Sequence, residues 1–530
     1  MKHYEKSNRR WFAGALVSVL LSNSFAVILQ FFKGDVLDFA VAGEIKETVF
    51  TAVLLIVFIL AEALSYYLFQ RFSAKYAICC VAGLRRDLFD SIFSRSYVDY
   101  KTQSQGEYLS KYMTEAETIR DRRFRMQPIL WEILLKIIFV SAALFRLDWR
   151  IALVTIALLT TPLYIPKLIA SRLQQAQTEY LQTMEENLSK VTDWLSGFEI
   201  IKNFSVEGKI REQFNTIHED TMEKLQQDTR LGAVAQLITT LISYLSYFVV
   251  LASAAWLVLN GTFSAGDFFV AIGMIDQLSY PLISMAGVIR QLLSVKPVCE
   301  EMEQFLQYTR AVRFDASVNN LNTGISYRNV SFSYDGTRKI LDGFTLSIQK
   351  GKRYLLKGPS GCGKTTAVNL LLKYFNADGG SIEIDGIPLD EIGNTYGLIT
   401  VVRQEAVLFH DTLRNNLTMY QPIPEEKLMD VLNCVGLHRY ANCRELNRMV
   451  TEGGANYSGG EKKRICLARA LLRDTEVLIL DEPLANLDAE TARRIEDLIL
   501  SIPGKTILVV SHQFTEEKVS CFDQVVAFTV

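Results

Sequence analysis

The chain has 530 residues, which at about 100 to 200 residues per domain predicts two to four domains. Hydrophobic residues make up 49% of it and charged residues 22%, and the long apolar runs all lie before about residue 295. A net charge of -2 offers no polyanion-binding footprint, so we expect no nucleic acid partner.

Six long apolar segments follow one another in the first part of the chain. Each approaches the ~20 residues that a helix needs to cross the hydrocarbon core of a bilayer. They are residues 11–32, 48–69, 128–145, 151–170, 232–259 and 267–295. We predict that all six span a membrane, because buried core helices can explain one or two such segments but not six in succession.

Positive charge indicates the orientation of these spans. Lys and Arg gather in the N-terminal tail and in the connection at 71–127, whereas the loops on the opposite side are short. Positive loops tend to stay in the cytosol. We therefore expect a multi-pass protein of the cytoplasmic membrane with both termini and the whole C-terminal part in the cytosol.

The two cytosolic connections, at 71–127 and 171–231, are long, charged and nearly free of proline. They predict helical hairpins that continue out of the membrane by about 25 Å, at 1.5 Å per residue. Their tips, near 102–107 and 193–197, are placed to press on a cytosolic domain.

Five charged residues fall within the predicted spans. Charges are costly in lipid, so we expect them to face a cavity or another helix. Two of them are four residues apart, which fits either an internal ion pair or contact with a substrate. The five are Glu62, Glu132, Lys136, Lys167 and Asp276.

A glycine-rich motif, G-x-x-x-x-G-K-[ST], follows the strand-like segment 353–357 and precedes the helical segment 367–374. Such a loop directs backbone amides and a helix N-terminus at phosphate oxygens. Lys364 would contact the outer phosphates, and the Thr365 hydroxyl would bind Mg²⁺. The motif comprises Gly358, Pro359, Ser360, Gly361, Cys362, Gly363, Lys364, Thr365 and Thr366.

Two further motifs lie downstream. An apolar strand at 477–480 ends in Asp481, suited to hold Mg²⁺ through water, and Glu482, suited to polarise an attacking water. Before it, Ser458 and Glu461 satisfy a capping box that starts a helix. Gly459 and Gly460 leave the amides of that helix N-terminus open to an anion.

Together these motifs resemble the ATP-binding cassette (ABC) superfamily, whose signature Leu-Ser-Gly-Gly-Gln corresponds here to Tyr-Ser-Gly-Gly-Glu at 457–461. In that family two cassettes pack head to tail, and the signature of one closes over the ATP held by the other. The resemblance implies that five residues contact ATP in trans. They are Ser458, Gly459, Gly460, Glu461 and Asp488.

The resemblance assigns further roles. Tyr334 would stack on adenine, Gln404 would bind Mg²⁺ and sense the membrane domain, and His512 would lie beside the γ-phosphate. Glu482, His512 and Lys364 would be the catalytic residues, with ATP and Mg²⁺ as ligands. Thr365, Gln404 and Asp481 would form the metal site.

The membrane part resembles the exporter type of this family. The implied fold is an all-α six-helix transmembrane domain at 1–310, a linker at 311–325, and an α/β P-loop NTPase cassette at 326–530. Segments 97–111 and 197–207 resemble the family's two coupling segments. Glu452 resembles the acidic residue that contacts those segments in the family. We expect neither a leader-cleaving N-terminal extension nor the usual C-terminal hairpin and helix.

The implied function is an ATPase that moves an amphipathic drug, lipid or peptide through the bilayer by alternating access. It would work as a dimer with a second half-transporter, identical or different. An exporter-fold importer, for example of a siderophore, and the active partner of a heterodimer are the alternatives. A cytosolic ABC ATPase acting on DNA or ribosomes is opposed by the six predicted spans.

Overall fold

The computed structural model describes residues 1–159, 165–307, 318, 320–359, 361–485 and 487–528. The chain divides into two compact units. The first comprises Met1–Phe93 and Gln105–Tyr308, and the second Ser94–Ser104 and Thr309–Val530. Most of the predicted linker at 311–325, namely 311–317 and 319, lies outside the described residues.

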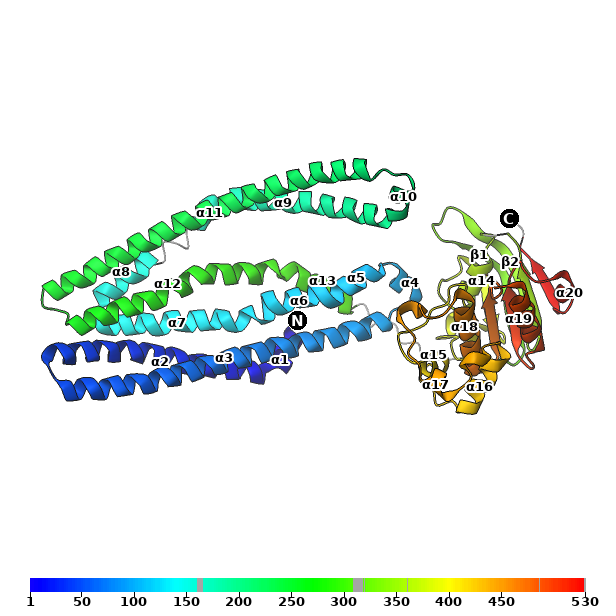
Figure 1. The fold of residues 1–530 in the computed structure, drawn as a ribbon, viewed down its shortest axis with the longest axis horizontal. Helices are drawn as coiled ribbons and strands as arrows, with labels where there is room; N and C mark the ends of the chain where they lie inside the picture. The colour runs from blue at the N-terminus through cyan, green and yellow to red at the C-terminus, as the bar shows by residue number, and fades with distance from the viewer. Residues whose placement is uncertain (160–164, 308–317, 319, 360, 486, 529–530) are drawn as a thin grey trace. The chain divides into compact units, whose positions relative to one another are not determined.

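Among its described residues the first unit consists of helices joined by turns and short loops (Figure 1). Its long helices are α2 (Arg9–Ala42), α3 (Ile45–Phe93), α7 (Met126–Leu147), α9 (Ile165–Ser196), α11 (Glu207–Leu259) and α12 (Ala265–Ser294). Its shorter helices are α1 (Lys2–Ser7), α5 (Gln105–Ser110), α6 (Ala116–Ile119), α8 (Trp149–Leu159), α10 (Phe198–Asn203) and α13 (Lys296–Gln307). Two π-helical turns, η1 (Lys111–Glu115) and η2 (Arg120–Phe124), join α5, α6 and α7 into one continuous helix.

Among the described residues, four helices are long and apolar enough to cross a membrane. They are α2, α3, the continuous helix Gln105–Leu147, and α11, and they carry the first, second, third and fifth predicted spans. The fourth predicted span falls on α8 and α9 and includes 160–164, which lie outside the described residues. The sixth coincides with α12, which continues as one helix through Pro281.

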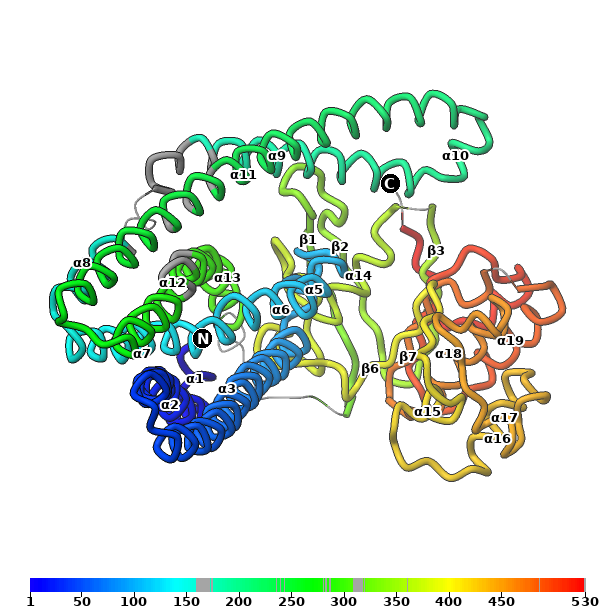
Figure 2. Tube along the Cα trace, turned by 60° about the vertical axis from the view of Figure 1, so that its left-hand side comes forward, coloured from blue at the N-terminus to red at the C-terminus, as the bar shows by residue number. Residues whose placement is uncertain are grey.

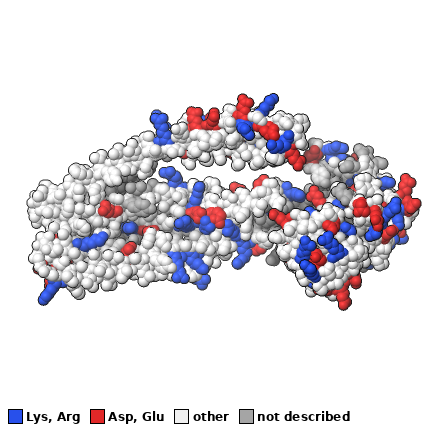
Figure 3. Space-filling model, in the orientation of Figure 1, with Lys and Arg blue, Asp and Glu red and all other residues white. Residues whose placement is uncertain are grey.

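The helices of this unit pack lengthwise (Figures 1 and 2). The helix α2 lies along α3 and α12, α7 packs on α12, and α9 runs beside α11 as a hairpin closed by α10. In Figure 3 charged side chains are few over the ends of the helices farthest from α10 and are numerous over α9 and the adjoining part of α11. This charge distribution fits a bilayer around the uncharged ends.

A glycine contact and an aspartate cap join α2 to α12. A Cβ on Gly266 would lie 2.4 Å from the Gly34 carbonyl oxygen, so the two backbones approach as only glycines allow. Asp38 on α2 accepts hydrogen bonds from the Ser264 hydroxyl at 2.6 Å and the Gly266 amide at 2.7 Å. The carboxylate thus caps the N-terminus of α12, where negative charge is stabilised.

The charged residues within the spans have different surroundings. Glu62 accepts a hydrogen bond from the Ser22 hydroxyl at 3.3 Å. Glu132 and Lys136 are both partly buried, but no ion pair joins them in the part of the chain that the structure describes. Asp276 is exposed, and the side chain of Lys167 lies outside the described residues. Of the two alternatives for Glu132 and Lys136, the internal ion pair is therefore not found among the described residues.

The second unit contains two sheets. A parallel sheet has the order β6-β7-β8-β3-β9 and an antiparallel one the order β2-β1-β4-β5. The parallel strands are β3 (Arg353–Lys357), β6 (Ile399–Val402), β7 (Val477–Asp481), β8 (Thr506–Val510) and β9 (Gln524–Ala527). The antiparallel strands are β1 (Gly324–Ser333), β2 (Lys339–Gln349), β4 (Gly379–Ile384) and β5 (Ile387–Pro388).

The second unit also contains helices. They are α14 (Lys364–Leu371), α15 (Leu413–Thr418), α16 (Glu425–Cys434), α17 (Cys443–Leu446), α18 (Gly459–Arg473), α19 (Ala489–Ser501) and α20 (Glu516–Val519). Every residue of β7 is buried, and its side chains alternate between two apolar clusters, with Val477 and Ile479 in one and Leu478 and Leu480 in the other. Because β3, β6, β7 and β8 are parallel, their carboxyl ends meet at one edge of the sheet, which is where ligands bind in such sheets.

The short helix α4 (Tyr97–Lys101) belongs to this second unit. Ser96 caps it by accepting a hydrogen bond from the Asp99 amide. The ring of Tyr97 stacks on Tyr374 with centroids 3.9 Å apart and planes within 11°. Tyr97 of the first cytosolic connection therefore packs within the second unit, whereas the predicted tip at 102–107 is divided between the two units.

Candidate functional site

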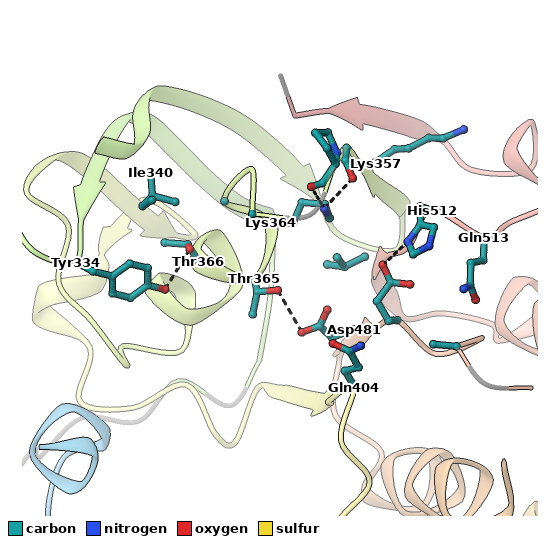
Figure 4. Close-up of a pocket in the computed structure, with 17 residues that line it drawn as sticks. Tyr334, Ile340, Lys357, Lys364, Thr365, Thr366, Gln404, Asp481, His512 and Gln513 are labelled. Carbon is teal, nitrogen blue, oxygen red and sulfur yellow. Dashed lines mark hydrogen bonds and ion pairs between the residues drawn. The ribbon is translucent and has the colours of Figure 1, made fainter. Parts of the chain in front are cut away.

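A cavity of about 890 Å³ opens where the parallel strands end (Figure 4). Twelve of the residues predicted for the nucleotide and metal sites line it: Tyr334, Gly358, Pro359, Gly361, Gly363, Lys364, Thr365, Thr366, Gln404, Asp481, Glu482 and His512. Five lining residues were not predicted: Ile340, Lys357, Ala485, Val510 and Gln513. Strands β3, β7 and β8 and the segment after β6 thus bring together residues that are far apart in the sequence.

The glycine-rich loop wraps around the ammonium of Lys364. This group donates to the carbonyl oxygens of Gly358 at 2.8 Å and Pro359 at 2.7 Å, and lies 3.5 Å from the Cys362 sulfur. Gly363 has φ 99°, and a Cβ there would lie 2.8 Å from a Leu341 methyl group, so glycine is required. Ser360 lies outside the described residues. The loop leads into α14, whose N-terminus suits an anion.

Three side chains with oxygen donors line the cavity beside this loop. The Thr365 hydroxyl donates to Asp481 Oδ2 at 3.5 Å, and Gln404 lines the same cavity. Burial raises the pKa of Asp481, and the guanidinium of Arg403, 3.8 Å away, partly opposes the shift. Hydroxyl, amide and carboxylate oxygens are a donor set that suits Mg²⁺.

A carboxylate and an imidazole meet on the other wall. Glu482 Oε1 lies 2.9 Å from His512 Nδ1, and the Ser511 hydroxyl donates to Oε2 at 3.4 Å. Glu482 has φ 49°, a strained backbone conformation for a residue with a side chain, and its amide donates to the Val510 carbonyl at 2.8 Å. Glu482 and His512 both line the cavity, and His512 is labelled in Figure 4.

Tyr334 stands at the rim. Its hydroxyl is 3.1 Å from that of Thr366, and its ring packs edge-on against Phe332 and Phe375. Because the side chain is still 54% exposed, a ring face remains accessible for stacking on a flat aromatic ligand.

The signature residues form the start of α18. The capping box is complete, with the Glu461 amide donating to the Ser458 hydroxyl at 3.3 Å and the Ser458 amide to Glu461 Oε2 at 2.8 Å. Tyr440 donates its hydroxyl to Glu461 Oε1 at 2.8 Å. Burial raises the pKa of Glu461, but these hydrogen bonds outweigh it and the net direction is downward. The glutamate at this position is therefore a charged anchor of the helix cap.

The residues predicted to act in trans lie apart from the cavity. Among the described lining residues, none is Ser458, Gly459, Gly460, Glu461 or Asp488. Asp488 instead caps α19 by accepting a hydrogen bond from the Thr491 amide at 2.9 Å, which lowers the pKa of Asp488. This second, structural role was not predicted, although an aspartate directly before a helical segment is a signal for it.

Comparison with known proteins agrees with this architecture. The model of the ABC transporter transmembrane region matches residues 12–282, just over half of the chain, and a second model, described as ABC transporter, matches residues 341–485. The chain is 26% identical over 521 residues to the uncharacterized ABC transporter ATP-binding protein YwjA of Bacillus subtilis, covering 96% of this chain and 89% of that one.

Two other relatives carry a described or proposed activity in their names. Over 475 residues the chain is 27% identical to an ATP-dependent lipid A-core flippase of Pseudomonas fluorescens, covering 87% and 78% of the two chains. Over 520 residues it is 26% identical to the putative multidrug export protein YgaD of Bacillus subtilis, and the match covers 94% of this chain and 88% of that one.

A solved structure has the same fold. The ATP-bound structure of a bacterial Atm1-family ABC exporter superposes with a TM-score of 0.81 at 19% identity, covering 98% of this chain and 93% of that one. With a helical membrane domain followed by an α/β cassette that binds ATP, the chain belongs to the ABC transporter family and is a membrane-embedded, ATP-driven half-transporter of the exporter fold.

Proposed function

We propose that the chain hydrolyses ATP in two sites, each shared between two half-transporters. This proposal is supported by the separation of two groups of residues. The cavity is lined by the phosphate loop, Glu482 and His512, but not by the residues at the N-terminus of the signature helix α18. A helix end with open amides is an anion site. It would complete the site of a partner through Ser458, Gly459, Gly460, Glu461 and Asp488.

Within each site, Lys364 would exchange its loop carbonyls for the outer phosphates of ATP, and Tyr334 would stack on adenine. Glu482, oriented by His512, would accept a hydrogen bond and then a proton from the attacking water. Thr365, Gln404 and Asp481 would hold Mg²⁺, which neutralises phosphate charge when it is bound.

The domain boundaries that we propose are 1–310 for the membrane domain, 311–325 for the linker and 326–530 for the cassette.

Transport would follow from closure of the paired cassettes. The second hairpin tip supports a docking role, because α10 exposes Phe198 by 58%, Ile200 by 64% and the following Phe204 by 75%. Large apolar side chains at a polar hairpin tip indicate a surface that a partner covers. Twelve spans would then surround a cavity that alternates between the two faces of the cytoplasmic membrane, with the cassettes in the cytosol.

Outward movement of an amphipathic substrate is the direction we propose, since the named activities of the relatives are flipping and export. In inside-out vesicles, ATP should drive accumulation of a hydrophobic dye or a fluorescent phospholipid, and E482Q vesicles should show none. ATP-dependent depletion of the same probes from inside-out vesicles, or uptake by right-side-out vesicles, would instead identify an importer.

Alkylation of Cys362 provides a test of the phosphate loop. A small alkylating reagent such as iodoacetamide should inhibit ATP hydrolysis, because the sulfur lies 3.5 Å from the Lys364 ammonium. Prior addition of ATP should protect the enzyme. The C362A variant should hydrolyse ATP and resist the reagent, although Cys434, Cys443 and Cys521 are exposed and still react. Full activity of protein modified at Cys362 would contradict the placement of this loop.

A further inference from the structure

A lysine of the signature helix holds the turn that carries Glu482. Lys463 lies on α18, two residues after Glu461. Its ammonium donates to the Ala485 carbonyl at 2.6 Å and lies 3.5 Å from the Glu482 carbonyl oxygen. Burial lowers the pKa of Lys463, an effect that the charge of Glu482 opposes. A hydrogen bond from an ammonium in such a half-buried place is stronger than one between neutral groups.

The turn at 482–485 is held from three sides. The Glu482 amide donates to the Val510 carbonyl at 2.8 Å on β8, and its carboxylate contacts His512. Lys463 supplies the third contact and is the one that comes from α18. Since Glu482 has a strained φ of 49°, its orientation depends on these surroundings rather than on its own backbone preference.

We propose that Lys463 is a positioning residue for ATP hydrolysis: it makes the signature helix and the turn bearing Glu482 move as one body. This inference rests on the proposed sharing of each site between two chains. The N-terminus of α18 would act on the ATP held by the partner, whereas Glu482 acts on the ATP held by its own chain. Closure of one site would thus set the carboxylate of the other.

The test compares two lysine-to-methionine changes in the full-length protein. K463M should lower kcat for ATP hydrolysis about 10-fold or more, because small displacements of a catalytic group are costly. The KM for ATP should change less than about two-fold, since the phosphate loop is untouched. K463R, which keeps the charge and the donors, should recover most of the rate. If K463M does not fold, K463Q replaces it, with the same expected fall in kcat and the same small change in KM.

K505M is the matched control. Lys505 also donates to a backbone carbonyl beside β7, that of Thr475 at 2.5 Å, and to Asp474 at 2.9 Å, but at the end of the strand away from the cavity. Its loss removes a comparable interaction without touching the turn at 482–485. K505M should therefore keep kcat within about two-fold of the unmodified protein.

A double variant separates positioning from general damage. If Lys463 acts through Glu482, adding K463M to E482Q should leave the residual slow hydrolysis unchanged. An equal loss in both backgrounds, or a K463M kcat within two-fold of the unmodified protein, would overturn the inference. Normal turnover by E482Q alone would contradict the proposed hydrolytic site itself, whatever the result at Lys463.

Discussion

Replacing Glu482 by glutamine is expected to lower ATP turnover by about 10²-fold or more while ATP still binds. The glutamine keeps the size and hydrogen-bonding shape of the side chain, but it cannot take a proton from water. Its amide can still contact His512, so the cavity should keep its form. Turnover is measured by phosphate release, and binding by the fluorescence of a nucleotide analogue.

A Glu-to-Gln change outside the cavity controls for loss of charge alone. Glu490 lies on α19, is exposed and, among the described residues, pairs only with Arg494 on the same helix. E490Q should keep the full rate, because an exposed pair of this kind contributes little to stability. An E482Q protein that keeps more than about a tenth of the normal rate would show that another group activates the water.

The second large effect concerns the sharing of sites between chains. K364A should abolish phosphate binding, and G459D should place a carboxylate where the partner's triphosphate would lie. A Cβ at Gly459 meets nothing within 4 Å, and an acid in the first turn of a helix is stabilising, so G459D should fold. Each variant alone, as a dimer, should have little ATPase activity.

Mixed dimers, purified through two different affinity tags, then give opposite results for shared and unshared sites. With K364A in one chain and G459D in the other, both defects fall in the same shared site, and one intact site remains. With both changes in one chain and none in the partner, both shared sites are damaged. We therefore expect the first arrangement to be the more active. The reverse order would place a complete site within each chain.

Much of the fold and of the site follows from local sequence. A helix that satisfies its own backbone in lipid needs a long apolar run, and this requirement predicted α2, α3, α7 and α11. The phosphate loop is equally local, since glycine at 363 is required by a positive φ within the loop itself. The capping box of α18 spans only four residues. Each of these signals is complete within one segment.

Residues that reach the cavity from neighbouring strands carry no such signal. Val510 and Ala485 line the cavity because β8 lies between β7 and β3, an order that appears only once the sheet is assembled. The contact of Tyr440 with Glu461 joins residues 21 positions apart, and that of Tyr97 with Tyr374 joins two distant parts of the chain. No repeating pattern in the sequence predicts either of these contacts.

The sequence by itself therefore determined the division into a membrane part and a cassette, the class of ligand and most of the residues that line the cavity. These properties depend on the chemistry and backbone geometry of short contiguous segments. Only the tertiary structure decided which side chains contact Glu482, how a glutamate fits the signature cap, and that Lys463 joins α18 to the turn at 482–485. Those interactions depend on the packing of segments that are distant in the chain, and long-range packing leaves no local pattern.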